Sequence, residues 1–496
     1  MALATRVGAG WRRGGLRTTG LEVLWEFSIL AGMKILLFLL ALPVALSVSA
    51  QDKFFEEPIG WRGKSIELHT ISDHDKQRSC LFLCNDDSIR VFLLDTKEAV
   101  VQHWYLNRLK EEQFLGGFIK GGKVYAFLQA SAGISDLHVW TLDIADGIGD
   151  DYTVPFAMRH ERAVEEISAG DHFLFMTANK KASQFAIYDF GENKTCDTLH
   201  YQFEDGIWKA LTTFDGGFSR EMAVLKVDPD EKMNPDMAHV PNKLYWMRDT
   251  LFLLMNKYQK GVTAVFSFDM RGKKVDFRKI THNNAQTFDP EHSYVDNSML
   301  LNGRLYFVSA EDNRLNVQVR DFYSGSLLKE YSAARDDDIT FKNTPIIQEG
   351  SFYHPGAREL AKTRQLLRKM VSGNAVLLVT PEDSGRVCLT IGAWQQMQRG
   401  GGFGGPMMMP GAPVFTSPGV FFRSTTVRSS RFKMLVDSAS LQYVPGDMPS
   451  DIGDRIEQYT EKVSIPPAGE TLFRNGGNYI YAYYNRDEHK IMLTKF

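Results

Sequence analysis

Apolar and polar positions follow one another in short stretches along much of the chain, and residues 302–331 show the pattern most clearly. Residues 305–308 form a continuous apolar run, which predicts a strand covered on both faces. Residues 315–320 alternate between apolar and polar, which predicts a strand with one exposed face. Asp321 and Gly325 then predict a tight turn, because the Asp carboxylate accepts nearby backbone N–H groups and Gly tolerates positive φ.

The same succession of turn and apolar strand recurs along the chain. Seven copies begin at Gln77, Gly122, Gly170, Asp249, Gly303, Gly373 and Gly477. In five of them an Asp closes the following strand, 18 to 21 residues after the turn: Asp95, Asp143, Asp189, Asp269 and Asp321. A repeated unit of about 45 to 54 residues with short strands is typical of a β-propeller, in which each blade buries its faces against its neighbours. The sequence therefore predicts an all-β fold with seven blades of four antiparallel strands.

Three copies are longer than the others and predict insertions. Subtracting the regular unit places the extra residues near 204–241, 355–372 and 389–430, within a single propeller domain that spans 51–496. In the second insertion, apolar residues at positions 360, 366, 367 and 370 have nearly helical spacing, which predicts one short amphipathic helix.

The last copy predicts how the ring closes. Only 19 residues follow Gly477, so the chain ends where the third strand of the last blade is expected to end and the fourth strand is missing. Because an open sheet edge favours aggregation, we expect the missing strand to come from the segment 53–70, where 65–70 alternates like a strand. On these features the chain resembles exported seven-bladed β-propellers of Gram-negative bacteria. The resemblance implies a ring with a central channel and a face of loops that binds proteins, glycans or small ligands.

The N-terminal segment has the features of a secretory leader. Residues 33–50 combine Lys34, an apolar run and the small residues 48–50, so we expect translation to start at Met33 and cleavage to follow Ala50. Residues 1–32 then form an upstream extension. The alternative is an uncleaved membrane anchor over residues 27–48. Both interpretations predict an exported protein, periplasmic or extracellular.

Composition narrows the possible functions. The 496 residues carry a net charge of −3, so nucleic acid is not an expected partner. Four cysteines and 12 histidines lack the spacings of a zinc site, and no phosphate-binding loop has a strand and a helix around it. The sequence thus predicts neither a metal nor a cofactor.

Carboxylates are the candidate catalytic groups. The repeated Asp residues fit structural turns at the corners of the blades. Catalysis at the channel would need paired acids on first strands or the loops before them, and the candidates there are Glu165, Glu166, Asp296 and Asp338. Charged residues of solvated loops are the alternative interpretation.

The third insertion has a distinctive composition. It is rich in Gly and carries the apolar side chains Phe403, Met407, Met408 and Met409, which suit contact with a partner or a membrane surface. A tolerated loop is the alternative. The favoured hypothesis is a non-catalytic binding or scaffold module of the cell envelope, whose partner is another envelope protein or a glycan. The alternative hypothesis is a glycan hydrolase or lyase that uses carboxylates at the channel mouth.

Overall fold

A computed structural model describes most of the chain beyond the leader. The described residues are 52–61, 65–73, 77–95, 100–107, 112–130, 136–156, 158, 160–212, 224–228, 233, 235–282, 293–350, 356–382, 385–396, 427–463 and 469–496. The segment Lys53–Phe496 forms one compact unit. The predicted leader and the Gly- and Met-rich residues 397–426 lie outside the described residues.

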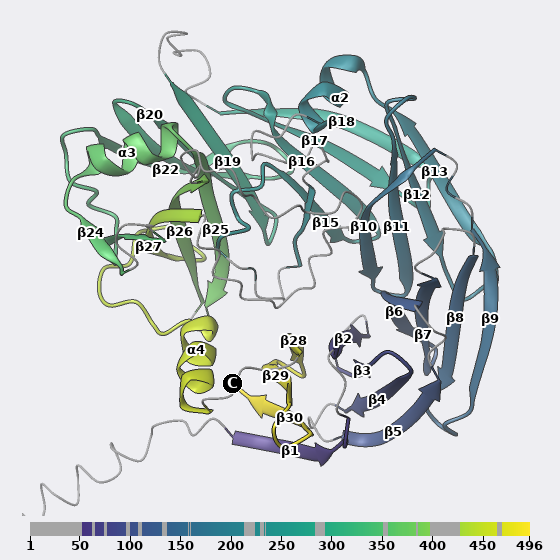
Figure 1. The fold of residues 1–496 in the computed structure, drawn as a ribbon. Helices are drawn as coiled ribbons and strands as arrows, with labels where there is room; N and C mark the ends of the chain where they lie inside the picture. The colour runs from purple at the N-terminus through teal and green to yellow at the C-terminus, as the bar shows by residue number, and fades with distance from the viewer. Residues whose placement is uncertain are drawn as a thin grey trace, which may run out of the picture. The chain divides into compact units, whose positions relative to one another are not determined.

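Seven β-sheets make up this unit, and Figure 1 shows them one after another around a ring. The first sheet contains β2 (Glu67–Ser72), β3 (Ser79–Cys84), β4 (Ser88–Leu94) and β5 (Val100–Asn107). The second contains β6 (Glu112–Lys120), β7 (Lys123–Ala130), β8 (Asp136–Asp143) and β9 (Gly149–Pro155). The third contains β10 (Arg162–Ala169), β11 (His172–Asn179), β12 (Gln184–Phe190) and β13 (Cys196–Gln202).

The remaining sheets are less regular. The fourth contains β14 (Val224–Lys226), β15 (Asn242–Met247), β16 (Thr250–Gln259), β17 (Val262–Asp269) and β18 (Lys274–Thr281). The fifth contains β19 (Tyr294–Leu301), β20 (Arg304–Glu311), β21 (Arg314–Asp321) and β22 (Leu327–Ala334). The sixth contains β23 (Ile346–Glu349), β24 (Arg358–Leu360), β25 (Asn374–Glu382), β26 (Arg386–Gln396) and β27 (Val427–Asp437). The seventh contains β1 (Asp52–Pro58), β28 (Glu470–Asn475), β29 (Asn478–Asn485) and β30 (Lys490–Lys495).

The prediction of an all-β propeller fold is confirmed. Strand pairs in the first six sheets are antiparallel except for β14 with β15. The first strands of neighbouring sheets contact one another, since β2 contacts both β28 and β6, β6 contacts β10, and β19 contacts β25. Two sheets have five strands where four were expected. The described residues contain three helices where one was expected: α2 (Asp205–Thr212), α3 (Thr363–Val371) and α4 (Ile452–Val463).

The Asn302–Gly303 turn and the Asp321 corner form as the sequence predicts, whereas the carboxylate of Asp189 bonds to the His172 ring at 2.8 Å. Asn302 and Gly303 both have positive φ in the hairpin between β19 and β20, and Gly303 accepts the backbone N–H of Phe322 at 2.9 Å. The Asp321 carboxylate accepts the N–H groups of Tyr323 and Ser324 at 3.1 and 2.7 Å. Similar bonds are made by Asp143, Asp269 and Asp437. These Asp side chains therefore stabilise corners.

Two expectations for individual strands were wrong. The polar face of β21 is buried, because Gln318 and Arg320 bond to each other and Gln318 also reaches Glu330 of β22. In the sixth sheet, the copy at Gly373 opens the first strand, β25, where the repeat predicted the second. The reason is that α3 precedes β25 and that β23, which comes earlier in the chain, pairs with β27.

The seventh sheet closes with a strand from the beginning of the described chain, as predicted. This strand is β1, which lies beside β30, and not residues 65–70, which contribute to β2. Phe55 of β1 contacts Phe92 of the first sheet edge to face, with ring centroids 5.9 Å apart. The backbone N–H of Ile59 then donates to His489 at 2.8 Å. Segments from both ends of the described chain therefore form one sheet.

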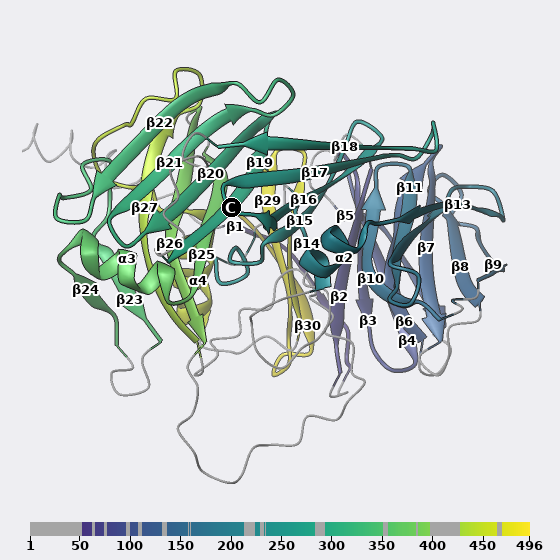
Figure 2. The same ribbon diagram turned by 90° about the horizontal axis from the view of Figure 1, so that it is seen from above.

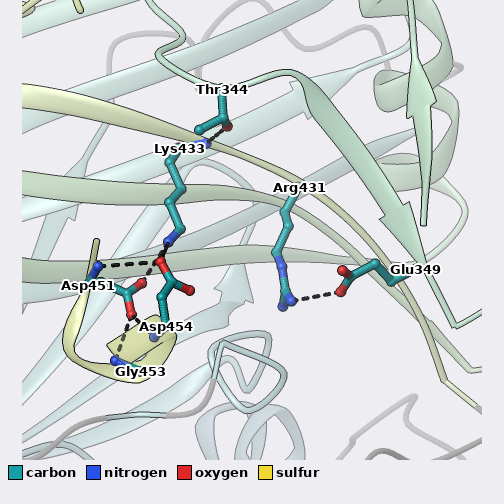
Figure 3. A network of polar contacts seen from close by, with 7 residues as sticks. All are labelled: Thr344, Glu349, Arg431, Lys433, Asp451, Gly453 and Asp454. Atoms are coloured by element: carbon teal, nitrogen blue, oxygen red, sulfur yellow. Dashed lines mark hydrogen bonds and ion pairs between the residues drawn. The ribbon is translucent and has the colours of Figure 1, made fainter. Parts of the chain in front are cut away.

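Helix α4 links the sixth sheet to the seventh, and Figure 3 shows its contacts with Lys433 of the sixth. Lys433 Nζ of β27 lies 2.6 Å from Asp451, which immediately precedes α4, and 3.4 Å from Asp454 in its first turn. Asp451 also accepts the N–H of Gly453 at 2.7 Å. The other side of α4 packs on the seventh sheet through Ile456 and Tyr459. No helix among the described residues is long and apolar enough to cross a membrane.

We expect β1 to stabilise the whole ring. Deleting residues 52–58 removes a paired strand and the burial of Phe54 and Phe55, so the free energy of unfolding should fall by at least about 3 kcal/mol. Denaturant unfolding of the two chains measures the difference. A chain lacking residues 399–413, which lie outside the described residues, is the control and should lose less. Equal losses would mean that β1 does not close the ring.

Candidate functional site

A pocket of about 670 Å³ lies where the fourth, fifth and sixth sheets meet. The pocket is lined by Ala210, Asn256, Lys257, Lys260, Tyr294, Val295, Asp296, Val371, Ser372, Gly373, Asn374, Trp394 and Gln396. Most of these residues lie at the ends of strands or in the turns between them. The lining is therefore mainly polar, with two cations and one indole ring.

Asp296 is the carboxylate of the pocket. Asp296 and Tyr294 lie two residues apart on β19, so their side chains leave the same face of the strand. The N–H of Gly261, in the turn between β16 and β17, donates to Asp296 Oδ2 at 3.1 Å. Burial raises the pKa of Asp296 to about 7, although the Tyr294 hydroxyl, this N–H, Lys257 and Lys260 all favour its charged form. Asp296 can therefore gain or lose a proton near neutral pH.

A buried polar network supports this part of the pocket. Asn297 Oδ1 accepts from Lys243 Nζ at 2.5 Å and from Asn256 Nδ2 at 3.3 Å. Asn297 Nδ2 donates to the carbonyls of Ala238 and Ala375 at 2.9 and 2.8 Å. One amide of the fifth sheet thus bonds to two other sheets, because Lys243 and Asn256 belong to the fourth and Ala375 to the sixth. Burial lowers the pKa of Lys243 to about 7, which reduces the cost of enclosing its amine.

Trp394 is held by a neutral histidine. The rings of His239 and Trp394 stack with centroids 3.9 Å apart and planes 2° apart. Burial lowers the pKa of His239 to about 4, so the imidazole is neutral at neutral pH and Nδ1–H donates to the Asp236 carbonyl at 2.5 Å. The indole is therefore fixed by contact on one side while it contributes to the pocket wall.

Of the four candidate carboxylates, only Asp296 lines the pocket. Glu165 and Glu166 lie on β10, the first strand of the third sheet. Burial raises the pKa of Glu166, and the charge of Lys226 opposes this shift. Asp338 is exposed in the loop after β22. The structure therefore does not bring these four carboxylates together in one pocket.

The sequence analysis missed most of the pocket. Asn256 and Asn297 interrupt apolar strands, as does Lys243, and polar residues at such positions need partners when they are buried. That signal could have marked these three residues, although not their partners. The described residues contain no cluster of His, Cys, Asp or Glu that could hold a metal ion.

Comparisons with known proteins find solved structures that align with this chain but no related sequence. No protein-family model and no curated protein matches this sequence. Among solved structures, a Synechocystis apocarotenoid oxygenase aligns over 55% of this chain and 62% of its own length, at 6% identity and a TM-score of 0.29. A prolyl endopeptidase aligns over 87% and 47%, at 10% identity and a TM-score of 0.36. This chain thus spans less than two thirds of the length of each of these two solved proteins.

A third solved structure is covered almost completely. The WD40 domain of SCAP from fission yeast aligns over 89% of this chain and 98% of its own length, at 7% identity and a TM-score of 0.31. All three TM-scores lie below 0.5.

Asp296 should make stability depend on pH. Its pKa of about 7 in the folded protein exceeds the ordinary value of 3.8, so the folded state holds the proton more tightly. The contribution to stability is therefore lost as the pH rises between these values. We expect the free energy of unfolding to fall from pH 5 to pH 8 by on the order of 2 kcal/mol more in the natural protein than in Asp296→Asn.

Denaturant unfolding at the two pH values measures this difference. Asp338→Asn is the control. Asp338 is exposed, so this substitution should give the same pH dependence as the natural protein. An Asp296→Asn variant with the same pH dependence as the natural protein would show that Asp296 does not titrate in this range.

Proposed function

We propose that this chain is an extracytoplasmic β-propeller that binds its ligand without transforming it, with the pocket around Asp296 as the ligand site. The observation that carries the proposal is the lining of the pocket. Trp394 offers an apolar ring, while Lys257, Asn374 and Gln396 offer amine and amide groups for hydrogen bonds. A few polar groups placed around an aromatic surface are typical of small-ligand sites.

A glycan is the ligand class that this lining fits best. Sugar rings have apolar C–H faces that pack on an indole, and their hydroxyl groups both donate and accept hydrogen bonds. The lining supplies acceptors in Asp296 and in the amide oxygens of Asn374 and Gln396, and it supplies donors in Lys257 and Lys260. Another envelope protein is the second partner class predicted from the sequence, with residues 399–420 as its contact.

Glycan hydrolysis is the alternative function. The pKa of Asp296 near neutral pH suits a general acid. Hydrolysis also requires a second carboxylate, about 5 to 9.5 Å away. Among the described lining residues, Asp296 is the only acid. Binding without catalysis is therefore the better supported proposal.

The proposal also includes export, on the basis of the leader. Cleavage after Ala50 would leave β1 complete, because β1 begins at Asp52. We expect the mature protein from the envelope fraction to begin at Gln51, and mass spectrometry of its N-terminal peptide checks this. Peptides from residues 1–32 in the mature protein would contradict the proposed start at Met33.

The binding proposal is tested with a panel of soluble neutral oligosaccharides and isothermal titration calorimetry. At least one should bind, and Gln396→Ala should weaken its binding roughly threefold to tenfold, the effect of one lost hydrogen bond. Gln396 is exposed at the end of β26, so this substitution should leave the fold intact. The matched control is Gln442→Ala, because Gln442 is exposed near the opposite end of the sixth sheet.

Three outcomes would contradict this proposal. Absence of binding across the panel would exclude a neutral glycan as the ligand. Equal weakening in the two Gln variants would place the ligand elsewhere. Release of shortened sugars by the natural protein but not by Asp296→Asn would replace binding by hydrolysis.

A further inference from the structure

Four cations gather at one edge of the sixth sheet. Arg368 and Lys369 lie in the last turn of α3, Arg358 lies on β24, and Arg428 lies on β27. Figures 1 and 2 both place α3 beside β24. Burial lowers the pKa of Lys369, and the charges of Arg428, Arg358 and Arg368 lower it further. Each of the three Arg side chains therefore lies within electrostatic range of the Lys369 ammonium. We call this group the cation cluster.

Strand register puts the cluster on one face of the sheet. Arg358 pairs with Gln348 of β23, and Gln348 pairs with Ser430 of β27. Directly paired residues point to the same face of a sheet, so Arg358, Gln348 and Ser430 share one face. Arg428 lies two residues before Ser430 on β27 and therefore points to that face too. Ile346 and Leu360, on the same face, belong to the hydrophobic core that also contains Leu366, Leu367 and Met370 of α3. The face is therefore apolar beside α3 and becomes polar and cationic toward its edge.

Three of these cations, Arg358, Arg368 and Lys369, have no ion pair with a carboxylate among the described residues. Arg358 Nε donates to the neutral Gln348 Oε1 at 2.6 Å, and Arg368 Nε donates to a backbone carbonyl of its own helix at 3.4 Å. Glu349 is adjacent to Gln348 but leaves the opposite face, where it binds Arg431 at 3.0 Å (Figure 3).

Buried donors face the same edge. Gln348 and Ser430 are each 1% exposed, and neither Gln348 Nε2 nor Ser430 Oγ has a hydrogen-bond partner among the described residues. A buried donor without an acceptor destabilises the fold, so an acceptor from a ligand would be favourable. The last turn of a helix favours cations, which accounts for Arg368 and Lys369. That effect does not account for Arg358, Arg428 or the two buried donors, because these lie on strands.

We propose that the cation cluster binds a ligand that carries a phosphate or sulfate group. A tetrahedral oxyanion offers several acceptors to guanidinium and ammonium groups at once, and Arg binds such anions through two parallel hydrogen bonds. Gln348 and Ser430 supply neutral donors on the same face. The site is separate from the pocket around Asp296, since none of its residues lines that pocket. It extends the proposed function and does not depend on it.

The test uses the full mature chain and isothermal titration calorimetry at constant ionic strength. Inorganic phosphate and sulfate are the probes, and acetate is the singly charged control anion. We expect phosphate or sulfate to bind and to raise the melting temperature, because a ligand that binds only the folded state stabilises it. Arg358→Gln and Arg428→Gln should each weaken binding at least tenfold. Arg314→Gln, an exposed position on the fifth sheet, should leave binding unchanged.

A second arm separates the two sources of the oxyanion. Vesicles of phosphatidylglycerol and of phosphatidylcholine are sedimented with the protein, and selective binding to phosphatidylglycerol would assign a lipid headgroup. Binding of the dissolved anions alone would assign a soluble ligand. The proposal is overturned if neither anion nor vesicle binds, or if Arg314→Gln weakens binding as much as Arg358→Gln. Lys369→Gln, checked for folding by circular dichroism, repeats the test if an Arg variant does not fold.

Discussion

Each sheet of this chain can bury its two faces only against the sheets beside it, and the rest of the structure depends on that constraint. A lone four-stranded sheet would expose apolar residues on both faces, so stability requires a continuous succession of sheets. The seventh sheet is where this succession must close, because strands from both ends of the described chain meet there. Two elements stabilise it. Strand β1 completes the seventh sheet, and α4 connects this sheet to the sixth through Lys433. Neither element belongs to the repeat.

A second constraint acts between the fourth, fifth and sixth sheets, where polar groups replace part of the apolar contact. Buried amides must be bonded, and Asn297 achieves this only when Lys243, Asn256 and Ala375 all lie in place. A partly bonded network would cost more than an apolar contact. The network therefore favours one arrangement of the three sheets. That arrangement also fixes the positions of the side chains that line the pocket between them.

Most of the fold could be predicted because strands and turns follow from local sequence. The Asn302–Gly303 hairpin and the Asp321 corner need only neighbouring residues. The sixth sheet could not be predicted in this way, because the pairing of β23 with β27 joins segments about 80 residues apart and follows no repeated pattern. Asp296 was a candidate because it lies on a first strand. Glu165 satisfies the same rule on β10, and the sequence does not show which neighbouring sheets form a pocket.

The pocket and the cation cluster lie where the sheets depart from the repeat. The first three sheets follow the regular unit of four strands in chain order. The pocket and the cation cluster both lie at the sixth sheet, where α3 precedes the first strand. Gly373, which follows this helix, lines the pocket, whereas Lys369 in its last turn lies among the cations. Both sites can differ from the regular sheets because the residues of α3 take no part in strand pairing. The nine residues of α3 thus contribute polar and cationic side chains, whereas the stability of the ring depends on the strands.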